Sequence, residues 1–390
     1  MMSCGVRSLF VATAVLALNV IAAQAAPFMI VGNDEKQAFD DGGKTILSLP
    51  GKDSVSIVDL ANPLSPKIIA NLPLKNSVVG PPVNLDIDPT GSIAIVADSM
   101  NVIKDGDALK LTPDDKIYVI DLKATPAKLV ATLTGDKQPS GLSINPAGTL
   151  ALVANRAGKS ISVLSIKGTE VKIVDTVPVG DEVSHVVFTP DGKRALATKF
   201  PGNKVALLDV AGEKVTYSKL DLPVGLWPYN VAVAPNGNIA LTADNGNAGT
   251  SDGNIDTVSV IDLSVQPPRV IDHIAVPDSP EGLAISPKGN IAAVIDATGS
   301  NKDHKAFFYH RNGVATILRI KGKKVTKLKD IEVGGLPEAV CFSPDGRYLY
   351  VGNYIDRDFS ILRVNGTNVT DTGKRFKVPG QPASARCSSH

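Results

Sequence analysis

The chain has 390 residues, with 40 Lys and Arg against 39 Asp and Glu and a formal net charge of +1. This balance provides no basic field for nucleic acid and no polybasic patch for a membrane surface. The five histidines are scattered, and no Cys/His zinc pattern is present. The composition therefore argues against a nucleic-acid-binding protein and against a structural zinc protein.

Residues 1–25 have the features of a secretory signal peptide. Arg7 supplies the positive charge, residues 9–23 are mostly apolar, and residues 23–25 read Ala-Gln-Ala, a small-x-small cleavage site. The apolar run is short for a membrane span. We therefore expect cleavage near Ala25-Ala26, a periplasmic or secreted protein, and a mature chain of residues 26–390 without an integral membrane segment.

A Pro-x-Gly turn recurs through the mature chain at intervals of roughly fifty residues. Proline presets φ at the second position of a β-turn, and glycine accepts the positive φ that follows, so each copy joins two strands tightly. The prolines of these turns are Pro89, Pro146, Pro190, Pro235, Pro287 and Pro344. Such a period predicts a solenoid or a propeller.

Seven runs of β-branched and aliphatic residues share one alternating pattern, which is typical of strands. They are residues 56–60, 118–122, 162–166, 206–210, 259–263, 316–320 and 360–364. Most are preceded by a strand that follows the Pro-x-Gly turn, and most are followed by another strand. Four antiparallel strands in each of seven units predict an all-β fold, a single-domain seven-bladed β-propeller over residues 26–390.

The repeats also carry a family resemblance. Residues 349–353 (Leu-Tyr-Val-Gly-Asn) follow the turn at 343–346, and residues 152–155 (Leu-Val-Ala-Asn) stand at the same place in an earlier unit. These runs resemble the YVTN repeat of bacterial and archaeal surface or periplasmic propellers. The resemblance covers essentially the whole mature chain and implies a fold similar to lactonase-type propellers. A true WD40 repeat is disfavoured because the Trp-Asp signature is absent and Trp227 is the one tryptophan.

Two segments can supply the innermost strand that closes the ring. Residues 378–383 and residues 31–35 both resemble the junction between units at 333–338. We favour the C-terminal segment because Pro382 stands in phase with the junction prolines. The N-terminal alternative would place Glu35-Lys36 at the channel.

Cys341 and Cys387 fall on or beside inner strands that flank this seam. In an oxidising compartment they can form a disulfide. Two free buried thiols are the other possibility, because spacing alone does not show pairing.

Three connections between the second and third strands of a unit are long: residues 99–115, 245–256 and 297–313. In a propeller these connections share one end of the ring with the junctions between blades. Because long loops in a compact domain are usually functional, this end is the predicted binding face. Neutral insertion at tolerant surface sites is the alternative.

Polar and aromatic residues of this face are expected to converge at the mouth of the central channel, as in a concave ligand site. Some begin the inner strands, and others belong to the long loops. The predicted ligand- or partner-binding residues are Asn84, Ser140, Ser184, Trp227, Tyr229, Asn230, Glu281, Glu338, Phe308 and Tyr309.

Glu281 and Glu338 stand at equivalent positions of adjacent blades. They could share a proton, hold a divalent cation such as calcium with asparagine oxygens, or be solvated on a rim. His185 is a candidate general base or an inner-strand histidine, and Arg386 could face a carboxylate or a lactone carbonyl. These four residues are the candidate catalytic groups.

Asp252, Asn254 and Asp256 alternate like the ligands of a calcium loop, but the full EF-hand pattern is absent. Asp, Asn and Gly are also ordinary turn residues. The loop is therefore a weak metal candidate, and no metal is assigned.

These features predict a binding or interaction module whose ligand or partner, a small molecule or an extracytoplasmic protein, engages the face with the long connections. The resemblance implies a first alternative, a lactonase-type hydrolase that a divalent metal could assist. A second alternative is an accessory protein to a periplasmic redox enzyme. No Gly-x-Ser-x-Gly elbow or dinucleotide fingerprint stands in a strand-to-helix context, so a covalent-nucleophile enzyme is unsupported.

Overall fold

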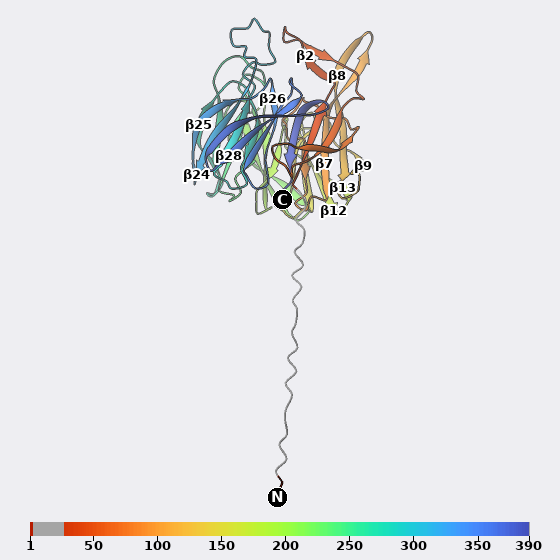
Figure 1. The fold of residues 1–390 in the computed structure, drawn as a ribbon, viewed down its shortest axis with the longest axis vertical. Helices are drawn as coiled ribbons and strands as arrows, with labels where there is room; N and C mark the ends of the chain where they lie inside the picture. The colour runs from red at the N-terminus through yellow and green to blue at the C-terminus, as the bar shows by residue number, and fades with distance from the viewer. Residues whose placement is uncertain (3–26, 390) are drawn as a thin grey trace.

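The computed structural model describes residues 1–2 and 27–389. Nearly all of the predicted signal peptide and its cleavage site lie outside the described residues. Residues 27–389 form seven four-stranded antiparallel sheets arranged as the blades of a ring, with no helix among them (Figure 1). The predicted seven-bladed β-propeller is confirmed.

The blades are numbered in chain order, and the strands of each are given from the inside of the ring outward. Blade 1 consists of β30 (Gln381–Cys387), β1 (Phe28–Asp34), β4 (Ser54–Asp59) and β5 (Lys67–Leu72). Blade 2 consists of β6 (Leu85–Ile87), β7 (Ile93–Asp105), β8 (Ala108–Asp121) and β9 (Lys128–Thr134). Blade 3 consists of β10 (Pro139–Ile144), β11 (Leu150–Asn155), β12 (Ser160–Lys167) and β13 (Glu170–Pro178).

The remaining blades follow the same order. Blade 4 consists of β14 (Val186–Phe188), β15 (Arg194–Lys199), β16 (Lys204–Ala211) and β17 (Lys214–Pro223). Blade 5 consists of β18 (Pro228–Val233), β19 (Ile239–Asp244), β20 (Asp256–Asp262) and β21 (Arg269–Val276). Blade 6 consists of β22 (Pro280–Ile285), β23 (Ile291–Asp296), β24 (Val314–Lys321) and β25 (Lys324–Glu332). Blade 7 consists of β26 (Pro337–Phe342), β27 (Tyr348–Asn353), β28 (Asp358–Asn365) and β29 (Asn368–Lys377).

The second strand of each blade is largely apolar in its middle, where it is covered on both faces. In β7, Ile93 and Ile95 pack into the cluster shared with blade 3, whereas Ala94 and Val96 pack into the cluster shared with blade 1. Successive side chains of a strand point to opposite faces of the sheet, so a strand between two neighbouring blades needs apolar residues at every position. The core is therefore a ring of interfaces between blades.

The C-terminal segment closes the ring. β30 pairs with β1 in antiparallel register, with Ala385 opposite Val31, and β1 pairs on its other side with β4. The favoured alternative is confirmed. The N-terminal alternative is wrong, because β1 is the second strand of blade 1 and Glu35-Lys36 therefore follow it into the connection to β4.

A disulfide joins Cys387 of β30 to Cys341 of β26, across the seam between blades 1 and 7, with a Cα–Cα distance of 5.8 Å. We expect a Cys341→Ser, Cys387→Ser double variant to lose about 2–4 kcal/mol of unfolding free energy, because the cross-link restricts the unfolded chain. Urea denaturation measures this. A reductant should destabilise the wild type and leave the double variant unchanged. Equal stability of the two proteins without reductant would contradict the expectation.

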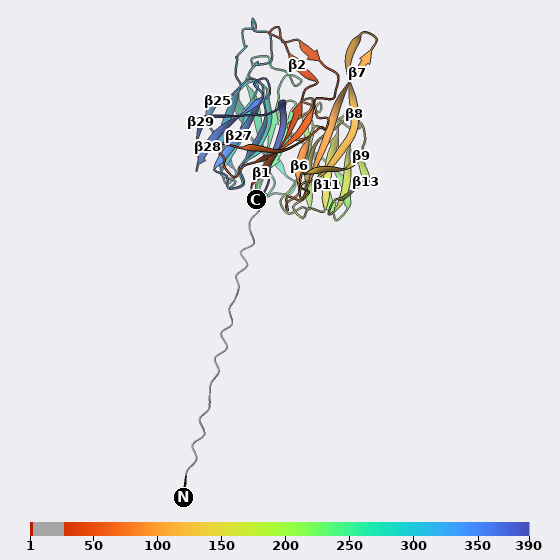
Figure 2. The same ribbon diagram turned by 45° about the vertical axis from the view of Figure 1, so that its right-hand side comes forward.

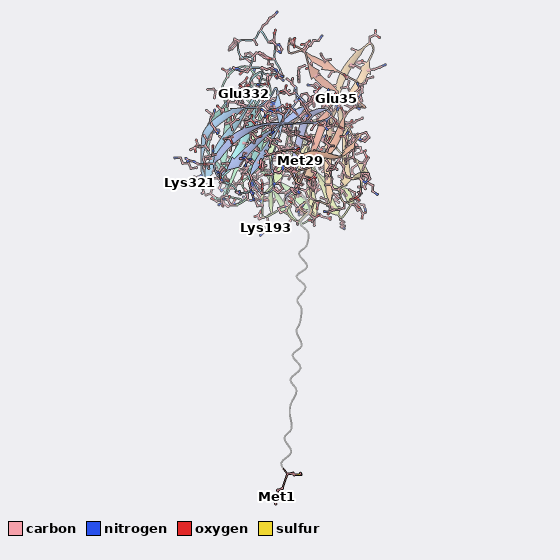
Figure 3. All side chains as sticks on the ribbon, viewed as in Figure 1. Met1, Met29, Glu35, Lys193, Lys321 and Glu332 are labelled. Carbon is pink, nitrogen blue, oxygen red and sulfur yellow. A yellow bond between two sulfur atoms is a disulfide. The ribbon has the colours of Figure 1, made fainter. Side chains whose placement is uncertain are left out.

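The enlarged connections all lie at one end of the ring, called here the loop end; the Pro-x-Gly turns lie at the other, the turn end. β2 (Gln37–Phe39) and β3 (Thr45–Leu47) form a further hairpin at the loop end, which the sequence did not predict (Figures 1 and 2). The connection at 99–115 is an extension of β7 and β8 as a two-stranded ribbon rather than an irregular loop. A bridge between Gly42 and Asp303 ties the hairpin to the 297–313 loop. Figure 3 shows Glu35 toward the loop end and Lys193 of a Pro-x-Gly turn at the opposite end.

Candidate functional site

The mouth of the channel at the loop end is built by irregular starts of the inner strands. The pairing of β10, β18, β22 and β26 with their second strands shifts register within three residues of the prolines that begin them. A bulge of this kind bends a strand and re-aims its side chains. It therefore takes Tyr229, Glu281 and Glu338, each of which follows such a proline, out of the regular alternation of the blade.

Glu281 and Glu338 are electrostatically coupled at this mouth. Glu338 is 3% exposed, and its Oε2 has no hydrogen-bond partner. Burial, together with the charge of Glu281, raises the pKa of Glu338 well above its usual range. Glu281 is half-buried, and burial raises its pKa to about 7. The two carboxyls titrate as a coupled pair, in which the charge of one favours protonation of the other.

Three further groups approach Glu281. The Asn245 side chain and the positive charges of Lys302 and Arg156 each lower its pKa, but by less than burial raises it. Burial lowers the pKa of Lys302, and the charge of Glu281 opposes that shift. All three lie on connections between second and third strands. Asn245 and Lys302 belong to the long connections of the predicted binding face, whereas Arg156 belongs to a short one that was not predicted.

The Arg156 guanidinium packs against two aromatic rings. Its guanidinium lies 4.7 Å from the Phe200 ring centroid and 5.5 Å from that of Tyr229. Its Nη1 donates to the Tyr229 hydroxyl at 3.1 Å, and its Nε has no partner. The Trp227 ring packs edge-on against Phe200 at 5.0 Å. Two of the predicted aromatic residues therefore position a cation beside the glutamates, Tyr229 directly and Trp227 through Phe200.

Small polar groups of blades 2 and 3 lie near Arg156. Asn84 donates to Asn76 Oδ1 at 2.6 Å and to the Ala97 carbonyl at 2.7 Å, and its own Oδ1 has no partner. The hydroxyl of Ser140 is likewise buried and without a partner. A Cβ at Gly80 would lie 2.6 Å from the Ser140 Oγ, so glycine is required for this close approach. Unpaired donors and acceptors of this kind are characteristic of a polar ligand site.

His185 and Arg386 are not brought to the glutamate pair. Both line a separate cavity of about 320 Å³ enclosed by the inner strands, together with Asn230. His185 Nδ1 accepts the Val231 N–H at 3.3 Å, and burial, with the charge of Arg386, lowers the pKa of His185 to about 3. Arg386 Nε lies 3.0 Å from Asp86 Oδ1. The four candidate catalytic residues thus fall into two groups, one at the mouth and one in a cavity that reaches Pro287 and Pro344 at the turn end.

Three other predicted binding residues lie away from the glutamate pair. The Ser184 hydroxyl is buried and bonds to Thr198 and to the Tyr229 carbonyl, which is a structural role. Phe308 lines a cavity of about 440 Å³ between blades 5 and 6. Tyr309 stacks on His304 with ring centroids 4.3 Å apart, beside a different cavity.

No metal site forms from the candidate loop. Among the described residues, no group of three or more His, Cys, Asp or Glu side chains is placed to hold a metal ion. Asp252 Oδ1 accepts the Asn254 N–H at 2.9 Å, and Asp256 Oδ2 accepts the Ser279 N–H at 2.8 Å. The first bond belongs to a local turn, and the second joins the loop to the segment before blade 6.

Comparison with known proteins places the chain by fold. No protein-family model matches it, and no curated protein matches its sequence. A candidate 6-phosphogluconolactonase from Bacteroides uniformis ATCC 8492 is 16% identical with a TM-score of 0.71; the match covers 93% of this chain and 100% of that one. The periplasmic gluconolactonase of Pseudomonas aeruginosa is 16% identical with a TM-score of 0.67, over 93% and 99% of the two chains.

A dihydro-heme d1 dehydrogenase in complex with DHE is also similar, at 16% identity and a TM-score of 0.55, over 93% of this chain and 75% of that one. At these identities the likeness concerns the fold, that of 6-phosphogluconolactonase-like seven-bladed propellers. Within residues 27–389, no helix is long and apolar enough to cross a membrane.

Proposed function

We propose that this protein is a lactone hydrolase that uses the glutamate pair at the channel mouth for acid–base catalysis. The observation that carries the proposal is the difference between the pKa values of two neighbouring carboxyls. The pKa of Glu281 is about 7, and that of Glu338 lies well above its usual range. When the surroundings shift the pKa values of two titratable groups apart, one group can act as a base and the other as an acid at the same pH. Glu281 is the base, and Glu338 is the acid.

The reaction follows from these roles. Glu281 takes a proton from a water molecule as the water oxygen adds to the lactone carbonyl carbon. Negative charge then develops on the carbonyl oxygen, where the Arg156 guanidinium, with its unpaired Nε, stabilises it. The ring C–O bond breaks, Glu338 protonates the departing oxygen, and a proton passes between the coupled carboxyls to restore the starting state.

The first test is a pH profile on a panel of five- and six-membered lactones, corrected for spontaneous hydrolysis. Because Glu281 must be ionised, kcat/KM is expected to rise with pH through about 7 and to fall about tenfold for each unit below it. EDTA should leave the rates unchanged, because the proposed acid–base mechanism uses no metal ion. A complete absence of turnover on the panel would contradict the proposal.

A binding module without catalysis is the second candidate, and the cavity of about 440 Å³ beside the 245–256 and 297–313 loops favours it. It predicts no turnover together with a ligand retained at the loop end. The accessory role to a redox enzyme remains a prediction supported only by the fold shared with the dehydrogenase. A periplasmic or secreted location is consistent with the Cys341–Cys387 disulfide, because disulfides persist in oxidising compartments.

A further inference from the structure

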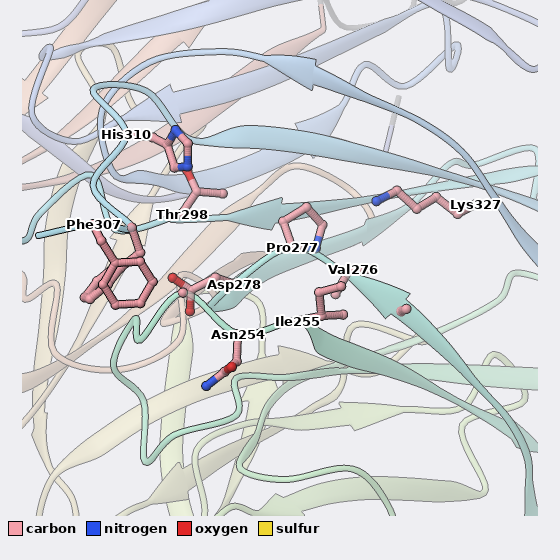
Figure 4. A pocket seen from close by; sticks show the side chains of 12 residues that line it. Asn254, Ile255, Val276, Pro277, Asp278, Thr298, Phe307, His310 and Lys327 are labelled. Carbon is pink, nitrogen blue, oxygen red and sulfur yellow. The ribbon is translucent and has the colours of Figure 1, made fainter.

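The cavity between blades 5 and 6 is a separate site, which neither Glu281 nor Glu338 lines. It has a volume of about 440 Å³ and lies between residues 253–255, the end of β21 with the segment that follows it, and the 307–310 segment (Figure 4). A volume in the range of about 300–1,000 Å³ is usual for small-molecule sites.

Its wall is apolar and aromatic, although it faces solvent. Phe307 is 91% exposed and meets the Phe308 ring edge-on at 5.2 Å. Gly253 has a φ of +82°, and a Cβ there would lie 2.6 Å from the Phe308 Cβ. Glycine therefore lets the 245–256 loop approach the phenyl rings closely. Exposed aromatic groups beside a formed cavity indicate a binding surface.

A buried carboxylate points into this cavity without a full set of partners. Asp278 is 7% exposed, and its Oδ1 accepts the Asp252 N–H at 3.1 Å. Its Oδ2 is buried and has no hydrogen-bond partner. Figure 4 shows the Asp278 carboxyl beside the phenyl ring of Phe307, with Lys327 on the far side of the cavity. An unpaired carboxylate oxygen requires a donor, and a cationic donor gives the strongest bond.

The charge around Asp278 is negative. Burial, together with the charges of Asp278 and Asp252, raises the pKa of Asp256 to about 6. Two cations stand nearby. Lys327 is already paired with Asp330 at 2.8 Å, and Lys302 donates to the Thr250 hydroxyl at 2.6 Å. His310 also lines the cavity. Neither lysine is hydrogen-bonded to the Asp278 carboxyl, although the charges of Lys302 and Asp278 interact.

We propose that this cavity binds a small organic ammonium ion, with its N–H donated to Asp278 Oδ2 and its apolar body against Phe307 and Phe308. Aromatic faces attract cations through their quadrupole, and a desolvated site strengthens that attraction. A neutral molecule of the same shape lacks the charge, and an anion meets the Asp278 carboxylate, the one acidic side chain among the lining residues. Size and polarity together therefore select an ammonium compound about as large as benzylamine.

The test is calorimetric titration of the mature protein with benzylamine, benzyl alcohol and benzoate, which share one shape and differ in charge. Benzylamine is expected to bind at least tenfold more tightly than either analogue. Asp278→Asn should weaken benzylamine binding at least tenfold and Phe307→Ala several-fold. Ile69→Ala on outer strand β5, a similarly exposed apolar position, is the matched control and should change nothing.

Equal binding of benzyl alcohol, or tighter binding of benzoate through Lys327 and His310, would overturn the proposal. Full affinity in a folded Asp278→Asn protein would overturn it as well. Glu281→Gln should leave benzylamine binding intact, so the outcome is independent of any hydrolase activity. A lysine-containing tripeptide in place of benzylamine distinguishes a side-chain ammonium from a small free amine, and its preference over benzylamine would contradict the small-molecule assignment.

Discussion

Replacement of Glu281 by glutamine is expected to lower kcat for lactone hydrolysis by about 100- to 10,000-fold, the usual contribution of a general base. Glutamine keeps the shape and the contact with Asn245 but takes no proton. Because Glu281 carries the pKa near 7, the limb of the pH profile that rises through about 7 should disappear with it.

Steady-state kinetics of the purified variant measure this result. Glu213→Gln is the matched control, since Glu213 is exposed in the turn between β16 and β17 at the turn end. Wild-type rates in the Glu281→Gln protein would remove Glu281 from the reaction and, with it, the proposed mechanism.

Replacement of Lys36 by methionine is expected to destabilise the fold by about 3–5 kcal/mol, because it leaves buried carboxylates without a counter-charge. Lys36 is 1% exposed, and its Nζ lies 2.7 Å from Asp53 Oδ2 and 3.5 Å from Asp34 Oδ1. It also donates to the Asn76 carbonyl. The ion pairs fasten the start and the end of the 35–53 connection to the ring.

Urea denaturation at two pH values checks this expectation. Burial raises the pKa of Asp34, and the Lys36 charge opposes that shift. Loss of Lys36 raises this pKa further, so the penalty is largest at neutral pH, where the carboxyl must ionise, and shrinks as pH falls and it is protonated. Lys44→Met, at an exposed position between β2 and β3, should cost less than about 0.5 kcal/mol. Equal stability of the two variants would contradict the role of Lys36.

The blade count and the seam were predictable because they depend on local chemistry. The Pro-x-Gly turns, the largely apolar second strands and the phase of Pro382 each specify their neighbours along the chain. The long-range pairing of Glu281 with Glu338 also followed, since equivalent positions of adjacent blades must lie side by side. A repeated pattern applies to every unit, so a prediction made for one unit also holds for the others.

The rest of the site depends on conformations that break the repeat. Arg156, Lys302 and Asn245 reach Glu281 from three different connections, whose paths no repeat defines. Lys36 occurs in a polar stretch of sequence, and its burial results from the folding back of the 35–53 connection over Asp34. One available signal was missed: the residue directly after a second strand lies at the loop end, which places Arg156 beside the mouth.

The position of β30 in the sequence affects the order in which the ring can assemble. A chain made from its N-terminus completes blades 2 to 7 from contiguous sequence, but the edge of β1 stays unpaired until residues 381–387 arrive. An unpaired edge is prone to wrong partners, so the nascent molecule is exposed to aggregation until β30 is made. β30 then closes the ring, and the Cys341–Cys387 bond fixes a closure that no earlier part of the chain can complete.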